Sequence, residues 1–429
     1  MQRSPGPILV LATVLVAACT TGQAVRSDVP PTTTSARASA ELRLVVGRTG
    51  EDRLQVMLAS TGEAIDRVSV GVPTETWDRV LTTMPDGNST VVQDVVVRAG
   101  SGGAFRAIPG AWRLPTVGLD PMPVGLAADG TTTALVEARE PDALGVGTTQ
   151  FAILKGALDP HPRIIKLDGV FDFDAISPVG ATLFVVEHLP APPAGHYQVR
   201  AVDVATGTLR DGVITDKRNV DEQMGGWAIA QLRRRDGLVL TLYRGEEHPF
   251  IHALDTVGAW AVCIDLPAIG HDETDAARDW GMVVAANGQS VVAVNATLGL
   301  VVDIDPTNLV ARRQATFQPT AGRAVRLAKF GHQDGAPVGQ QVVATPDGST
   351  IFAAGATGIV RIAMDDLGVT ARLLDGEAID GLALAPDGST LFALRGADGR
   401  IVRLDTASGR ILAPVPGDGF DRLVAVLPG

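Results

Sequence analysis

Short apolar runs alternate with polar turns over most of the chain, and the alternation is clearest near the C-terminus. Residues 341–354 and 381–394 each read as an apolar strand, a Pro-Asp-Gly turn and a second apolar strand. Proline presets φ for such a turn, aspartate caps it, and glycine takes the positive φ that other residues resist. Both segments are therefore predicted to be β-hairpins.

The last unit continues beyond its hairpin. A third strand is predicted at residues 400–405, a turn at 406–409 and a fourth strand at 410–412. Four short antiparallel strands per repeat, punctuated by turns, are typical of a β-propeller blade. The unit resembles the bacterial YVTN and WD40-like propeller repeats, whose inner hairpin carries a Ser-Pro-Asp-Gly type of turn.

Weaker copies of the unit run back along the chain. Inner-hairpin turns are predicted in five further places, at residues 85–87, 128–130, 178–180, 235–237 and 286–288. Outer turns at 204–207 and 305–308 match the one at 405–409. The spacing between inner turns varies from about 40 to about 60 residues, which is within the range of propeller repeats.

The two ends of the repeat region complement each other. Residues 420–427 read as an inner strand with nothing after it, whereas residues 42–65 read as a blade that lacks its inner strand. Together they would complete one blade and remove the open sheet edges at the seam. We therefore expect an all-β fold with a single propeller of eight blades. Seven blades, a β-sandwich or two smaller β domains are the alternatives.

The N-terminus reads as an export signal. Arg3 precedes an apolar run at residues 8–16, and the sequence Val16-Ala17-Ala18-Cys19 resembles the lipobox of bacterial lipoproteins. That resemblance implies cleavage before Cys19 and a lipid on its thiol; an ordinary signal peptide is the alternative. The predicted organisation is a signal peptide at 1–18, a disordered Thr/Pro/Ser-rich tether at 19–40 and a propeller at 41–429.

Charge and composition narrow the partners. The formal net charge of −12 disfavours nucleic acid. If Cys19 is acylated, Cys263 is left alone in an apolar run, where a buried structural role is expected. Lysine is nearly absent while arginine is common, which suggests a high-GC, actinobacterial genome. We expect a monomer held by lipid at the extracytoplasmic face of the cell membrane.

A propeller usually binds its ligand at the mouth of the central channel. The candidates there are Asp78, Asp174, Trp227, Asp279, Trp280, Asp380 and Asp421. Several carboxylates in a ring could hold Ca²⁺ or attract a cationic ligand, although aspartates that cap turns and tryptophans that pack between blades would look the same. No cofactor is otherwise predicted.

Catalytic motifs are absent from the sequence. It contains neither a Gly-x-Ser-x-Gly elbow nor a phosphate-binding Gly-x-x-x-x-Gly-Lys loop. His248 and His252 would lie roughly 13 Å apart in a strand, too far for one metal. The sequence favours a binding or scaffold module for a protein or small molecule that it does not identify. A lactonase-like hydrolase with its site at the channel mouth is the alternative.

Overall fold

The computed structural model describes one compact unit within the chain. The described residues are 41–48, 51, 53–97, 104–118, 122–138, 147–156, 159, 161–189, 196–219, 224–272, 276–285, 288–319, 340–355 and 357–429. Cys19 and the predicted signal peptide and tether lie outside them. No helix in the described ranges is long and apolar enough to cross a membrane.

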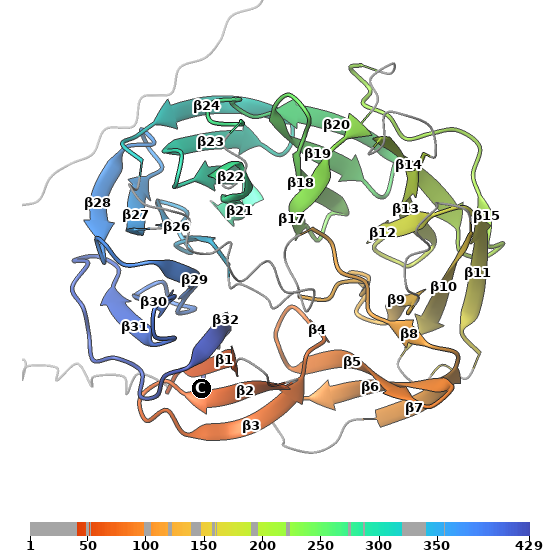
Figure 1. The fold of residues 1–429 in the computed structure, drawn as a ribbon, viewed down its shortest axis with the longest axis horizontal. Coiled ribbons are helices and arrows are strands. Elements are labelled where there is room, and N and C mark those ends of the chain that lie inside the picture. The colour runs from red at the N-terminus through yellow and green to blue at the C-terminus, as the bar shows by residue number, and fades with distance from the viewer. Residues whose placement is uncertain are drawn as a thin grey trace, which may run out of the picture. The chain divides into compact units, whose positions relative to one another are not determined.

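Eight small antiparallel sheets form a ring, as predicted (Figure 1). From the inner to the outer strand, blade 1 contains β32 (Phe420–Leu427), β1 (Arg43–Arg48), β2 (Arg53–Leu58) and β3 (Ala64–Ser69); blade 2 contains β4 (Val72–Pro73), β5 (Arg79–Asp86), β6 (Ser89–Val96) and β7 (Ala104–Pro109). Blade 3 contains β8 (Trp112–Arg113), β9 (Thr132–Glu137), β10 (Thr148–Lys155) and β11 (Arg163–Asp168); blade 4 contains β12 (Phe171–Ile176), β13 (Thr182–His188), β14 (His196–Asp203) and β15 (Thr208–Leu209), with β16 (Met224–Gly225) also on β14.

The remaining blades follow the same order. Blade 5 contains β17 (Trp227–Arg233), β18 (Leu238–Arg244), β19 (Pro249–Asp255) and β20 (Trp260–Asp265); blade 6 contains β21 (Trp280–Ala285), β22 (Ser290–Asn295), β23 (Leu300–Asp305) and β24 (Val310–Thr316). Blade 7 contains β25 (Val342–Ala344), β26 (Thr350–Gly355), β27 (Gly358–Ala363) and β28 (Val369–Leu373); blade 8 contains β29 (Ile379–Leu384), β30 (Thr390–Arg395) and β31 (Ile401–Asp405). A short 3-10 helix, Ala276–Arg278, precedes blade 6.

The Pro-Asp-Gly signals form the turns they predict. Asp347 Oδ1 accepts a hydrogen bond from the Ser349 amide at 3.0 Å, and the Ser389 amide bonds Asp387 in the same way. The strand after each turn carries a fully buried phenylalanine, Phe352 or Phe392, in the apolar layer between blades. One repeated sequence pattern therefore produces both the turn and the core contact.

The first and last strands of the described unit share blade 1, as the complementary half-blades predict. Strand β32 pairs antiparallel with β1, and the register places Val45 opposite Ala425 and Val46 opposite Leu423. Phe420 and Leu423 are buried with Leu44 and Val46 in one apolar cluster. The last strand of the unit thus closes the ring against its first.

Two sequence predictions about strands are wrong. The turn at 85–87 joins the second and third strands of blade 2, because the inner strand is the two-residue β4. The predicted fourth strand of blade 8 at 410–412 is reduced to a single bridge between Leu404 and Ile411. Both errors come from strands too short to show an alternating pattern.

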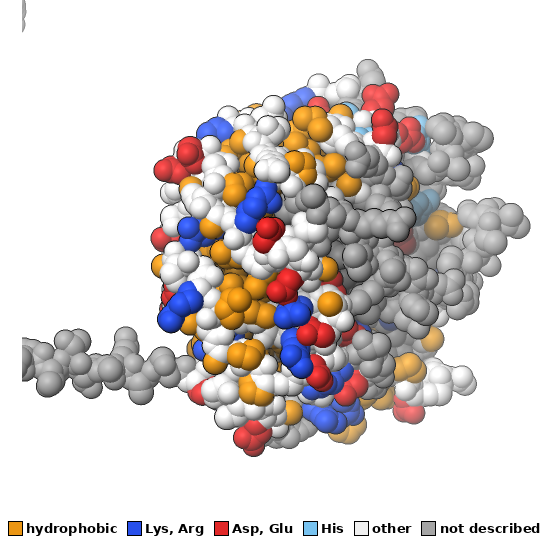
Figure 2. All heavy atoms as spheres, turned by 60° about the vertical axis from the view of Figure 1, so that its left-hand side comes forward, with side chains coloured by type: hydrophobic (Ala, Val, Ile, Leu, Met, Phe, Trp, Pro, Cys, Tyr) orange, Lys and Arg blue, Asp and Glu red, His pale blue; other side chains and the backbone are white. Residues whose placement is uncertain are grey.

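Charged side chains of both signs lie intermixed on the outside of the blades. On the face that Figure 2 shows, they alternate with small apolar areas, and neither sign collects into one large patch.

Candidate functional site

The central channel has two distinct ends. In seven blades the chain enters at the inner strand and continues outward, and in blade 1 the inner strand β32 runs antiparallel to β1. The inner strands therefore all run in the same direction along the channel. We call the end where these strands begin the start end, and the end where they turn into the second strands the turn end.

Five of the seven predicted site residues lie at the start end: Asp279 directly precedes β21, and the other four belong to inner strands. Trp227 and Trp280 are the first residues of β17 and β21, and Asp380 and Asp421 are the second residues of β29 and β32. Trp227 is 45% exposed, and the Arg244 guanidinium lies 5.0 Å from its ring centroid. Trp280 is only 2% exposed and packs in the core between blades, so it cannot meet a ligand.

Three predicted aspartates occupy irregular positions in the inner strands. The pairing registers shift at Asp174, Asp380 and Asp421, so each lies at a bulge of its strand. Such a bulge bends a strand and redirects its side chains. Asp174 and Asp380 are buried as a result, and Asp421 Oδ1 lies 3.5 Å from Arg422 Nε.

Asp174 is held in a polar layer between blades 4 and 5. It is 1% exposed, and Gln231 Nε2 donates to its carbonyl oxygen at 3.1 Å and to its Oδ1 at 3.3 Å. Burial raises the pKa of Asp174 to about 6, although the nearby Arg233 guanidinium opposes the rise. Burial also lowers the pKa of Arg233, to about 10. This carboxyl group can therefore change charge near neutral pH.

The seven predicted residues do not surround one mouth. Asp78 lies in the loop between β4 and β5, at the turn end, because the inner strand of blade 2 precedes it. Its carboxylate accepts hydrogen bonds from Thr74 and Thr76, which lower its pKa. Asp279 accepts one from Thr297 at 2.5 Å, just before β21. These two aspartates therefore stabilise local loops.

Two adjoining cavities lie at the turn end. The first has a volume of about 780 Å³ and mainly apolar walls from blades 1, 2, 3 and 8; among its lining residues are Pro73, Trp77, Met122, Val124, Leu384 and Leu423. The second has a volume of about 630 Å³ and lies over the turns of blades 2 to 5. Pro73, Glu75, Thr76, Pro123 and Val124 line both cavities. We call them the apolar cavity and the charged cavity.

An ion pair spans the turn end between blades that are not neighbours. Arg235, in the turn after β17, donates through Nε to Glu75 Oε2 at 2.6 Å, and its second nitrogen contacts Glu75 Oε1. Blades 3 and 4 separate these residues along the ring. The sequence analysis missed this pair; the run Arg233-Arg234-Arg235 just before a predicted turn was the available signal.

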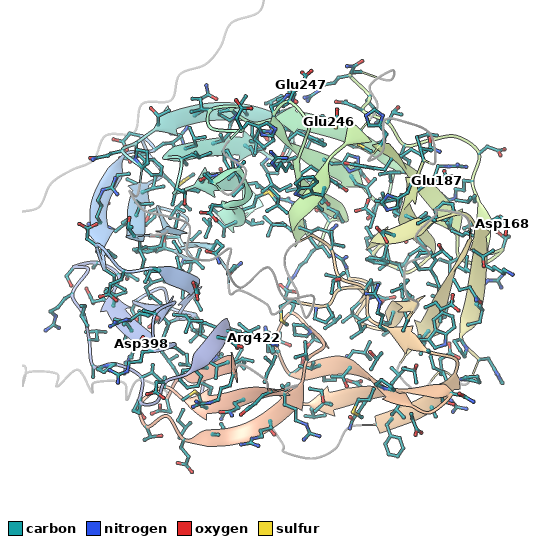
Figure 3. The ribbon with its side chains drawn as sticks, in the orientation of Figure 1. Asp168, Glu187, Glu246, Glu247, Asp398 and Arg422 are labelled. Atoms are coloured by element: carbon teal, nitrogen blue, oxygen red, sulfur yellow. The ribbon has the colours of Figure 1, made fainter. Side chains whose placement is uncertain are left out.

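A smaller cavity, of about 260 Å³, lies away from the channel between blades 4 and 5. His196 Nε2 lies 3.4 Å from Glu246 Oε1 and His248 Nε2 lies 3.0 Å from Asp265 Oδ1 along its walls. Figure 3 shows Glu246 and Glu247 near the outside of the ring. His252 is fully buried and, unlike His248, does not line this cavity. Within the described ranges, no three His, Cys, Asp or Glu side chains are placed to hold one metal ion.

Comparison with known proteins supports the architecture alone. No protein-family model and no curated protein matches the sequence. A structure of apo AztD from Citrobacter koseri is 12% identical over 91% of this chain and 99% of that one, with a TM-score of 0.54. Another C. koseri AztD structure is 13% identical over 91% and 98% of the two chains, with a TM-score of 0.51. A periplasmic gluconolactonase, PpgL of Pseudomonas aeruginosa, is 15% identical over 80% and 97%, with a TM-score of 0.40.

The strand order, the closure and the two AztD structures define the class of the protein. It is an all-β, eight-bladed propeller. The low identities show the fold and nothing finer.

Proposed function

We propose that this chain is a cell-envelope lipoprotein whose propeller binds a ligand or a partner protein at the turn end of its channel. The adjoining apolar and charged cavities carry this proposal. Concave, largely apolar sites with a few polar groups are where proteins usually bind other molecules. The walls come from blades that are far apart in the sequence. Closure of the ring holds these blades, and hence the walls, at fixed positions.

The cavity can be tested by filling it. Val124 is half-buried and lines both cavities, so Val124→Trp should block the site. Val310→Trp is the matched control, because Val310 lies on the outer strand of blade 6. The three proteins would serve as bait for components of the cell envelope. A component recovered by the wild type and the control but lost with Val124→Trp is expected; identical recoveries would count against the proposal.

A lactonase-like hydrolase remains the second candidate because of Asp174. A carboxyl group whose pKa is about 6 changes charge near neutral pH. Asp174 is too buried to touch a substrate, so it would act through its charge on Arg233, which contacts it and lines the charged cavity. The discriminating measurement is hydrolysis of gluconolactone by the purified protein and by Asp174→Asn. Hydrolysis that this substitution abolishes would replace the binding proposal with the enzymatic one.

The anchor is tested separately. We propose that a lipid on Cys19 holds the protein at the extracytoplasmic face of the membrane, with residues 20–40 as a tether of up to roughly 70 Å. Cys19→Ala should move the protein from the membrane fraction to the soluble fraction. Cys263→Ala, which removes the other cysteine, should leave it in the membrane. Membrane retention of Cys19→Ala would contradict the lipid anchor.

A further inference from the structure

The charged cavity is richer in positive than in negative side chains, although the chain as a whole is acidic. Four arginines and three acidic residues line it, whereas the chain carries a net charge of −12. They are Arg79, Arg233, Arg234 and Arg235, against Glu75, Asp78 and Asp129. Such a local surplus favours an anion at this end of the channel.

Most of these charges are already engaged within their own blade or with the adjacent one. Asp129 accepts hydrogen bonds from the Thr131 and Thr132 amides, at 2.7 and 2.9 Å. Arg234 contacts Asp236 and the Gly288 carbonyl oxygen, both at 2.7 Å. Arg79 pairs with Asp94 at 2.9 Å, and Arg233 donates to Gln231 at 2.8 Å.

Arg235 differs from its neighbours because its partner belongs to a distant blade. Its side chain is 80% exposed, and that of Glu75 is 64% exposed. Exposed ion pairs contribute little to stability, since water solvates both charges well. The two-point contact with Glu75 nevertheless shows that the guanidinium is turned so that it can grip a carboxylate with two nitrogens. An external carboxylate or phosphate can therefore replace Glu75 at small cost.

Glu75 also lines the apolar cavity, so its displacement would open one cavity to the other. The apolar cavity offers Trp77, Leu384 and Leu423 as walls for a hydrocarbon body. We infer that the turn end binds an amphipathic anion, whose apolar part fills the apolar cavity and whose anionic group takes the place of Glu75 on Arg235. This inference rests on the proposed function and names the ligand class of the same site.

Octanoate is a suitable probe, with 1-octanol and octylammonium as neutral and cationic probes of equal chain length. Calorimetric titration of the purified full chain should show octanoate binding at least tenfold more tightly than either control. Arg235→Ala should weaken octanoate binding about tenfold. Glu75→Gln should strengthen it severalfold, because it removes the competing negative charge while keeping the size of the side chain.

The opposite effects of the two substitutions on octanoate binding distinguish a ligand site from a structural bridge. A bridge that only joins blades 2 and 5 would lose the same stability in either variant, and neither would change octanoate binding. Equal binding of octanoate and 1-octanol, no binding of octanoate, or equal effects of the two substitutions would each overturn the inference. The Val124→Trp experiment reports on the proposed function independently, because it does not depend on the charge of the ligand.

Discussion

Aspartate has several roles in this chain, and its surroundings decide among them. Asp387 and Asp405 cap turns, so their pKa values are lowered by hydrogen bonds from Ser389 and Ser408. Sequence can predict these roles, because the turn residues are adjacent in the chain. It could not predict the burial of Asp174, because the bulge that redirects this residue depends on how β12 pairs with β13.

The buried Asp174 should make stability depend on pH in an unusual direction. Its pKa is about 6 in the folded protein and about 3.9 in an unfolded chain, so the folded state loses stability as the pH rises from about 4 to about 6. Asp174→Asn should therefore stabilise the protein at pH 7.5 by on the order of 3 kcal/mol, and this advantage should vanish near pH 4.

Denaturant unfolding at several pH values measures this difference. Asp211→Asn, at an exposed position in the same blade, is the control and should show no such pH-dependent gain. A stability difference between Asp174→Asn and the wild type that stays constant from pH 4 to 7.5 would show that Asp174 keeps its charge on folding.

Turn chemistry explains how the hairpins could be predicted and why one was misplaced. A Pro-Asp-Gly turn forms the same way between inner strands as between outer ones, so the signal at 85–87 did not reveal its position in the blade. The inner strand β4, Val72–Pro73, is too short to show an alternating pattern. Asp78 consequently lies at the opposite end of the channel from most of the predicted site residues.

The turns also contribute contacts between blades, which predicts unequal effects of two similar substitutions. Gly388 has φ +74°, and a Cβ there would lie 2.5 Å from Pro346 Cδ in the neighbouring blade. Gly87 has φ +57° and no atom within 4 Å of such a Cβ. Gly87→Ala should cost about 1 kcal/mol from backbone strain alone, whereas Gly388→Ala should cost about 1–3 kcal/mol more because of the clash.

Denaturant unfolding of both variants measures their free energies of unfolding and shows whether Gly388→Ala loses more stability than Gly87→Ala. Equal losses would mean that the Pro346 ring moves aside freely and that the turns of blades 7 and 8 do not support each other.

At the scale of the whole molecule, sequence was informative about closure and uninformative about the site. The two half-blades could be matched because each keeps the repeat pattern. The Glu75–Arg235 ion pair could not be predicted, since its members lie 160 positions apart and meet only once blades 2 to 5 curve round the channel. Local patterns predict strands and turns, but contacts across a ring depend on blade number and on where each inner strand ends.

Closure through β32 predicts that this strand is indispensable. Deleting residues 420–429 would leave the β1 edge unpaired and remove Phe420 and Leu423 from the core, so the remaining chain should unfold or aggregate.

Gly429 lies against the backbone of Glu41, so a short linker can join these ends. A circular permutant that begins at Pro414 and runs through β32 into β1 keeps every strand of blade 1. Circular dichroism and thermal unfolding should find it folded, with an unfolding temperature near that of residues 41–429. A deletion variant that unfolds as cooperatively as that parent would show that blades 1 and 8 hold the ring together without β32.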